Sequence, residues 1–146
     1  EISCSLVGSE MCIRDRGINC GGWGLFLKTE DMAKIGQLLL QNGMWEGKRI
    51  LPAWWVGEAT REQVSNISPG TPADQVATLR ATSQWAQGYG YQLWRSLDGC
   101  YRADGAYGQY IVVAPRQDAV VVVTEYTDRG GTQLDLIWKY LLPALD

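Results

Sequence analysis

The spacing of short apolar runs in the C-terminal half constrains the fold of this chain more than any other feature. Strand-like runs occupy residues 90–95, 101–104, 109–114 and 119–125, and the last two are rich in β-branched residues. Turn-forming sequences lie in the gaps between them, at residues 98–99, 105–108 and 115–118. Links this short join antiparallel neighbours, because parallel strands need a crossover of about a dozen residues or more. The pattern therefore predicts an antiparallel meander, and residues 120–123, which are apolar on both faces, predict a central, covered strand.

Helical patterns flank the expected strands on both sides. Residues 29–40 carry apolar side chains at helical spacing, with Thr29 as the expected N-cap and Asn42-Gly43 as the expected end. A second helix, opened by a proline, is expected over residues 53–63, and an amphipathic helix over residues 132–142 closes the chain. A strand meander with helices before and after it places the chain in the α+β class.

Two connecting segments separate these elements. Residues 44–50 predict a short hairpin-like connection around Glu46-Gly47. Residues 65–83 are rich in Ser, Thr, Pro and Ala, and they predict a long irregular loop.

The first sixteen residues differ in composition from the rest of the chain. They lack a sustained apolar period and end in an alternating charged run, and no basic start precedes a long apolar stretch as in a signal peptide. The string SLVGSEMCIRDR resembles a translated sequencing adapter. We therefore expect residues 1–16 to be a non-native leader and residues 17–146 to be the folded part. The alternative is a native N-terminal segment.

Charge and residue usage exclude several functional classes. The 13 basic and 16 acidic residues are scattered, so no basic patch favours binding to nucleic acid or to an anionic membrane. No apolar run approaches the ~20 residues that a membrane span needs. Histidine, the commonest metal ligand and general base, is absent, and the four cysteines are too widely spaced for a zinc site. We expect no metal and no organic cofactor, and we interpret Cys20 and Cys100 as small apolar residues.

Residues 101–110, with the sequence YRADGAYGQY, form the most informative segment for function. Gly105 and Gly108 stand three residues apart at the turn between two expected strands. Glycines at such a turn let the backbone approach a ligand closely and leave N–H groups free to point at it. Taken alone, the segment also fits a glycine-rich hairpin that binds nothing.

The order of motifs along the chain resembles the β-lactamase-like, penicillin-binding-protein-like serine hydrolases, which include class C β-lactamases, esterases and 6-aminohexanoate-dimer hydrolases. The motifs are Gly21-Gly22-Trp23-Gly24-Leu25, residues 29–39, Asn42-Gly43, Ile50-Leu51-Pro52, Trp54-Trp55-Val56, Gly88-Tyr89-Gly90-Tyr91 with Trp94, and residues 101–110. Each motif is weak alone, but their order and spacing hold from about residue 17 to residue 145. The resemblance implies the C-terminal part of a β-lactamase-like fold: an antiparallel meander flanked by helices, with a C-terminal helix. It also implies a missing N-terminal part of the same domain as the partner of this chain.

The resemblance also implies a site. In the family, a sheet-edge strand with a Lys-Thr-Gly or His-Thr-Gly triplet forms one side of the substrate cleft, and here Ala103-Asp104-Gly105 occupies the triplet. The Ala106 N–H is then expected to donate to the oxyanion hole, and Gly105 to keep the strand flat for substrate. The remaining residues expected to line the cleft are Ala103, Asp104, Tyr107, Gly108 and Gln109.

The nucleophile of the family lies in a Ser-x-x-Lys motif, and a Tyr motif supplies a proton shuttle. No serine in this chain has a lysine three residues later, so we expect neither nucleophile nor base here and no activity from the chain alone. Ala103 replaces the usual cation, Asp104 is expected to repel an anion, and Arg102 is expected to point to the face opposite Ala103. A small ester or amide is therefore the expected substrate, rather than a β-lactam.

The alternative reading is a non-catalytic, aromatic-rich module that binds a sugar or a peptide. The chain has seven Trp and seven Tyr, most of which fit core positions. The aromatic residues expected to line a cleft under either reading are Trp85, Tyr89, Tyr107 and Tyr110.

Overall fold

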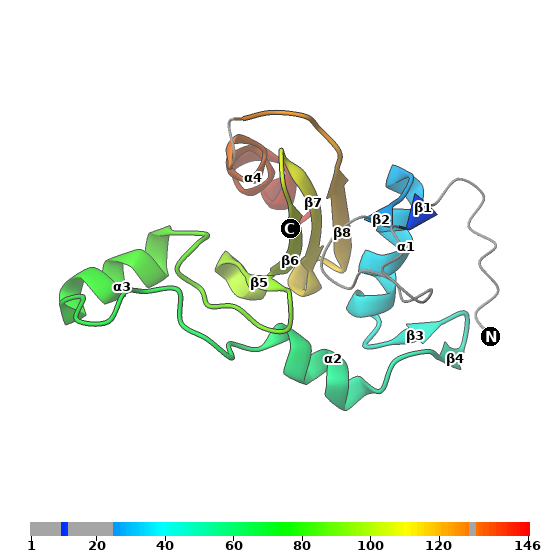
Figure 1. Cartoon of the computed structure of the whole chain (residues 1–146), viewed down its shortest axis with the longest axis horizontal. Coiled ribbons are helices and arrows are strands. Elements are labelled where there is room, and N and C mark those ends of the chain that lie inside the picture. Colours follow the sequence, from blue (N-terminus) through cyan, green and yellow to red (C-terminus); the bar gives the residue numbers. More distant parts are fainter. Residues whose placement is uncertain (1–9, 12–24, 129–130) are drawn as a thin grey trace.

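A computed structural model of the chain describes residues 10–11, 25–128 and 131–146 (Figure 1). Its centre is an antiparallel sheet in the order β5-β6-β7-β8. The strands are β5 (Trp94–Arg95), β6 (Tyr101–Gly105), β7 (Gln109–Ala114) and β8 (Ala119–Val123). Each strand pairs with the next one in sequence, as the short turns between the apolar runs predict. The strand expected to begin at residue 90 is restricted to β5, because a tight turn through Gln92, with φ of 57°, separates residues 89 and 94.

Helices cover both faces of this sheet, which confirms the α+β class. Helix α1 (Thr29–Leu40) lies against β7 and β8 on one face. On the other face lies the C-terminal helical segment, which comprises α4 (Thr132–Leu136), the π-helical turn η4 (Ile137–Leu141) and η5 (Leu142–Ala144). The expected C-terminal helix is therefore present as one continuous helical segment.

Two apolar clusters hold the layers together, one on each face of the sheet. The cluster under the C-terminal helical segment contains Cys100, Tyr110, Val112, Ala114, Leu134, Ile137 and Leu142. The cluster on the opposite face contains Leu39, Val56, Ala59, Leu93, Tyr101 and Val113. Successive residues of a strand point to opposite faces, so β7 contributes to both clusters in alternation. Burial raises the pKa of the Cys100 thiol to about 11, and Cys100 therefore serves as a small apolar core residue.

The segment between α1 and the sheet begins with the expected hairpin. Strands β3 (Met44–Trp45) and β4 (Lys48–Arg49) pair around Glu46 and Gly47, whose φ angles of 46° and 76° fit a two-residue turn of type I′. Helix α2 (Ala53–Thr60) follows, with Pro52 at its N-cap, and it ends three residues before the expected boundary.

The loop expected over residues 65–83 is wrong in part, because helix α3 (Ala73–Thr82) lies within it. After Pro72 the segment contains Ala, Gln, Leu and Arg, which favour a helix. The helix buries none of its residues, so it lacks the apolar stripe by which amphipathic helices are identified. It projects from the sheet as an arm (Figure 1), and Arg80 binds Glu62 at 2.6 Å at its base.

The expectation of a central, covered strand over residues 120–123 is wrong as to the central position, and the expected N-cap is wrong. Strand β8 is the edge strand of the described sheet, and all its residues are only partly buried, whereas β7 is central and almost wholly buried. The residues of β8 are apolar on both faces because α1 and the C-terminal helical segment each cover one face of this strand. Thr29 is not an N-cap either: Lys28 precedes the helix, and the Thr29 hydroxyl lies 3.0 Å from that of Thr124.

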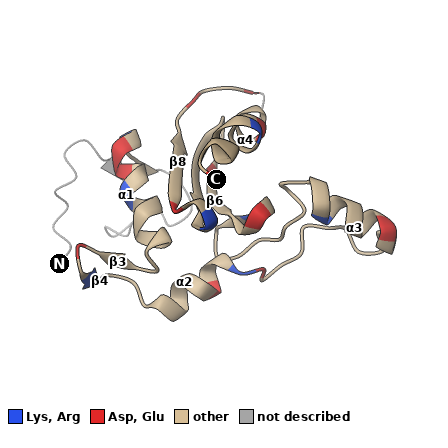
Figure 2. Cartoon of the chain, turned by 180° about the vertical axis from the view of Figure 1, so that it is seen from behind, with Lys and Arg blue, Asp and Glu red and all other residues tan. Residues whose placement is uncertain are grey.

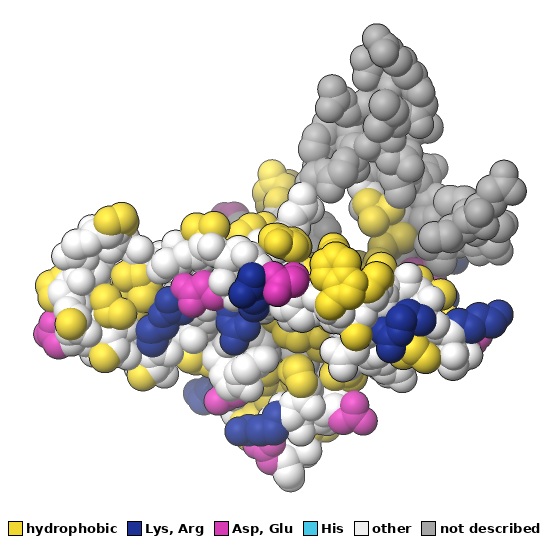
Figure 3. Space-filling model, turned by 90° about the horizontal axis from the view of Figure 1, so that it is seen from below, with side chains coloured by type: hydrophobic (Ala, Val, Ile, Leu, Met, Phe, Trp, Pro, Cys, Tyr) yellow, Lys and Arg dark blue, Asp and Glu magenta, His cyan; other side chains and the backbone are white. Residues whose placement is uncertain are grey.

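The expected leader falls mostly outside the described residues, and so does the Gly21–Gly24 motif. Of residues 1–16, the structure describes only β1 (Glu10–Met11), which pairs with β2 (Leu25–Phe26). Within the described residues, no helix combines the length and apolarity needed to cross a bilayer. Charged residues are distributed over most elements (Figure 2), and on the face formed by α2 and α3 they are interspersed with apolar side chains (Figure 3).

The close approach of α1 to the sheet generates a stability prediction. A Cβ on Gly36 would lie 2.4 Å from Val120 Cγ1 and 2.9 Å from Ile111 Cγ2, and both of these side chains are stiff. We expect Gly36→Ala to lower the free energy of unfolding by about 1–3 kcal/mol, because overpacking outweighs the gain in helix propensity. The matched control is Gly57→Ala in α2, where a Cβ meets nothing within 4 Å. It should raise that free energy by about 0.5–1 kcal/mol in urea titrations, and a Gly36 variant as stable as the Gly57 variant would contradict the packing.

Candidate functional site

The outer edge of β6 is open at the end nearest the β6–β7 hairpin. β6 pairs with β7 along its whole length, from Tyr101 opposite Val113 to Gly105 opposite Gln109. On its other side β5 pairs only with Tyr101 and Arg102. In the part of the chain that the structure describes, no strand therefore pairs with the outer edge at residues 103–105. An unpaired strand edge presents backbone N–H and C=O groups that can bind an extended ligand.

The residues expected to form the site all lie on this strand end and its hairpin. Ala106, Tyr107 and Gly108 form the turn between Gly105 and Gln109. Gly108 is buried, with φ of 90°, while the other four are exposed. The hairpin thus brings together a small unpaired edge and an exposed turn.

The side chains of β6 alternate between the two faces of the sheet. The Ala103 methyl packs against the apolar cluster that includes Leu39 and Val56. Arg102 and Asp104 lie together on the opposite face, with Arg102 Nε donating to Asp104 Oδ2 at 3.0 Å. Asp104 is expected to repel an anion, but the guanidinium of Arg102 pairs with its carboxylate and offsets this charge.

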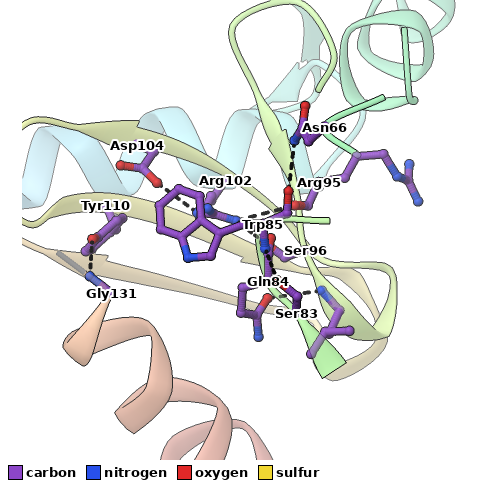
Figure 4. A network of polar contacts seen from close by, with 11 residues as sticks. Asn66, Ser83, Gln84, Trp85, Arg95, Ser96, Arg102, Asp104, Tyr110 and Gly131 are labelled. Atoms are coloured by element: carbon purple, nitrogen blue, oxygen red, sulfur yellow. Dashed lines mark hydrogen bonds and ion pairs between the residues drawn. The ribbon is translucent and has the colours of Figure 1, made fainter. Parts of the chain in front are cut away.

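Arg102 is the most heavily bonded polar residue near the site, although its side chain is 0% exposed. Its Nη1 donates to Ser96 Oγ at 2.7 Å, and to the carbonyl oxygens of Gln84 and Arg95 at 3.3 Å each. Figure 4 shows these bonds converging on the guanidinium from residues 84–96. Arg102 thereby fastens that segment to β6, next to the open edge.

The electrostatics of the pair reflect this burial. Burial lowers the pKa of Arg102, and burial raises the pKa of Asp104 although the nearby guanidinium acts in the opposite direction. For both groups the loss of hydration outweighs the attraction between them. Arg102 Nη2 is also buried without a hydrogen-bond partner among the described residues, which adds to the energetic cost of the arrangement.

Aromatic rings surround this network. The Trp85 ring lies over the guanidinium, 4.5 Å from Arg102 Cζ, and is itself 43% exposed. Trp94 makes edge-to-face contacts with Trp85 at 5.2 Å and with Tyr89 at 5.0 Å. A cation held against aromatic faces gains electrostatic stabilisation. These contacts fix the position of Trp85 beside the strand.

The four aromatic residues expected to line a cleft differ in their exposure to solvent. Trp85 and Tyr107 are exposed beside β6 and its hairpin, and Tyr89 is partly buried against Trp94. Tyr110 is a core residue, and its hydroxyl accepts a hydrogen bond from the Gly131 N–H at 3.3 Å. Its side chain points towards the C-terminal helical segment because Tyr110 and Val112, two residues apart on β7, face the same side of the sheet.

The sequence analysis missed Tyr126 and the pairing of Arg102 with Asp104. Tyr126 stacks on Tyr107, and no local pattern indicates this contact between distant segments. Arg102 and Asp104 carried a usable signal, because opposite charges two residues apart on a strand share one face. Among the described residues, no group of three acidic or cysteine side chains is placed to hold a metal ion.

The buried pair generates a prediction about coupling. We expect Arg102→Met to lower the free energy of unfolding by about 3 kcal/mol or more, because it leaves the Asp104 carboxylate, whose side chain is only 13% exposed, without its partner. The double variant Arg102→Met/Asp104→Leu should cost at least about 1 kcal/mol less than the sum of the two single variants.

The matched control is the exposed pair Arg116 and Asp146, whose side chains are 60% and 50% exposed. The same substitutions there should show a coupling of only about 0–0.5 kcal/mol in a double-mutant cycle. Equal coupling at the two pairs would contradict the structural role of Arg102.

No family model matches the chain, and no curated protein matches its sequence. Solved structures do match. One is a protein designated a 6-aminohexanoate-dimer hydrolase from Bacillus anthracis, with a TM-score of 0.62 and 23% identity, covering 92% of this chain and 32% of that one. Another is a protein designated a beta-lactamase from Bacteroides dorei DSM 17855, with a TM-score of 0.55 and 22% identity, covering 82% of this chain and 40% of that one. The chain therefore has a β-lactamase-like fold, of which it spans less than half the length seen in these two proteins.

Proposed function

We propose that this chain is the C-terminal part of a serine hydrolase that cleaves small esters or amides through an acyl-enzyme intermediate. The observation that carries the proposal is the open end of β6 beside the exposed Ala106 turn, in a β-lactamase-like fold. The Ala106 N–H takes part in none of the turn hydrogen bonds among the described residues, so it is free to donate to a ligand.

The role of Ala106 is to stabilise developing charge. When a nucleophile attacks an ester or amide carbonyl, negative charge builds on the carbonyl oxygen. An N–H held at the end of a paired strand needs no reorganisation to receive that charge. Gly105, which lacks a side chain, lets the substrate lie flat against the strand edge. The serine nucleophile, its lysine and the second oxyanion donor would come from the N-terminal part of the same domain.

The charges near the hairpin favour esters and amides over β-lactams. Ala103 carries no charge and packs against the apolar cluster, and the Arg102 guanidinium is buried and bonded to Asp104. The described residues of β6 and its hairpin thus offer no free cation for the carboxylate that β-lactams carry. A neutral substrate meets no penalty at such a site.

The missing nucleophile supplies the first test. The gene from which this chain comes should encode a Ser-x-x-Lys motif upstream of the Gly21-Gly22 segment. The intact protein should hydrolyse a simple chromogenic ester, while the 146-residue chain alone should not. An intact reading frame without that motif would remove the proposal.

The second test concerns the N–H of Ala106 in the intact protein. Ala106→Pro removes this donor, while Ala106→Ser keeps it and changes the side chain only slightly. We expect kcat/KM for ester hydrolysis to fall roughly 100- to 1000-fold in the proline variant and less than about threefold in the serine variant. Melting temperatures of both variants control for folding. Equal turnover in the two folded variants would show that Ala106 is not an oxyanion donor.

A further inference from the structure

Two exposed tyrosines from distant segments stack beside the proposed oxyanion donor. The rings of Tyr107, in the hairpin turn, and Tyr126, just after β8, lie with centroids 4.7 Å apart at an interplanar angle of 27°. They remain 54% and 83% exposed. We call these two residues the tyrosine pair. An exposed pair of large rings has surface available for a ligand.

The backbone fixes the pair in place. The Thr127 N–H donates to the Tyr107 carbonyl oxygen at 3.0 Å, which joins the hairpin to the segment after β8. A Cβ on Gly108 would lie 3.1 Å from Thr127 Cγ2, so the two segments are packed closely. A side-chain bond from Gln133 to Glu125 anchors the same segment to α4. Figure 1 shows this segment arching from β8 past the end of the sheet towards α4.

Tyr107 occupies a strained backbone conformation. Its φ of 67° lies in the left-handed region, where glycine is favoured and a bulky residue is an outlier. Strain of this kind persists where surrounding structure enforces it, and it occurs preferentially at functional sites. The ring of Tyr107 is exposed and fills no core space, so packing within the fold does not account for its presence.

We propose that the tyrosine pair is a specificity-determining platform that binds a flat or extended apolar group of the substrate. The proposal rests on the proposed hydrolase function. Ala106 marks the position of the scissile carbonyl oxygen, and Tyr107 is the next residue, so the platform lies one residue from the reacting group. Ring faces bind aryl and alkyl groups, whereas the buried Arg102 and its partner Asp104 offer no free cation. The preferred substrates are therefore aryl or longer alkyl esters or amides rather than acetyl compounds of small alcohols.

The test compares Tyr107→Gly and Tyr126→Ala with wild type in the intact enzyme. The control is Tyr140→Ala, an exposed tyrosine on the C-terminal helical segment. Glycine adopts the positive φ of residue 107 without strain, so Tyr107→Gly should melt within about 5 °C of wild type. This keeps a change in selectivity separate from a loss of fold.

Two substrate series identify which part of the substrate the platform binds. The first is 4-nitrophenyl acetate, octanoate and benzoate, which vary the acyl group. The second is the acetate esters of ethanol and 2-naphthol, which vary the leaving group. In at least one series, the ratio of kcat/KM for the larger substrate to that for the smallest should fall roughly three- to tenfold in both platform variants. The ratio should be unchanged in Tyr140→Ala.

An unchanged ratio in both series would overturn the platform, and so would an equal loss for every substrate. If Ala106→Pro abolishes turnover while the ratios stay flat, the hydrolase proposal stands and the platform alone fails. An intact enzyme that hydrolyses none of these esters, although it folds, would remove both proposals.

Discussion

The buried guanidinium of Arg102 is the interaction on which the site depends. A charge removed from water must be matched by partners, and residues 84–96 supply most of them through Ser96 and main-chain oxygens. Asn66 Nδ2 donates to the Trp85 carbonyl at 3.1 Å and extends the constraint further along the chain. Because this segment is bonded to Arg102, it covers the outer edge of β6 at residues 101–102 and leaves residues 103–105 open. One buried charge thus sets the boundary between the closed and open parts of the strand.

The same interaction decides what the open edge can offer. Asp104 would be the nearest charge to a ligand on this strand, but it is bonded to Arg102 at 3.0 Å. What remains for recognition is backbone at Gly105 and Ala106 and aromatic surface at Tyr107. Selectivity at such an edge rests on shape and apolar contact, because the charges are neutralised inside the fold.

The local elements could be predicted from the sequence because their signals are local. The strands, α1 and the hairpin at Glu46-Gly47 follow from apolar period and turn residues, and the likeness to β-lactamase-like proteins is confirmed at the level of fold. The short turn between the two predicted strands also places residues 103–109 in one hairpin. Helix α3 was not predicted because it buries none of its residues. The edge position of β8 was not predicted because apolar residues on both faces indicate that helices cover the strand, and they do not indicate its position in the sheet. The stacking of Tyr107 on Tyr126 and the bonds of Arg102 to residues 84–96 join separate segments, which no local pattern encodes.

The two ends of the open edge are held by opposite kinds of interaction, and this separates fold from selectivity. At one end, Arg102 is fully buried, so a change there leaves a charge or a cavity in the core and destabilises the fold. At the other end, Tyr107 and Tyr126 are exposed, so their side chains can change with little effect on stability. A strained φ at Tyr107 means that glycine is tolerated there as well. In the proposed hydrolase, substrate preference can therefore be altered at the tyrosine pair while the buried network continues to hold the proposed oxyanion strand in place.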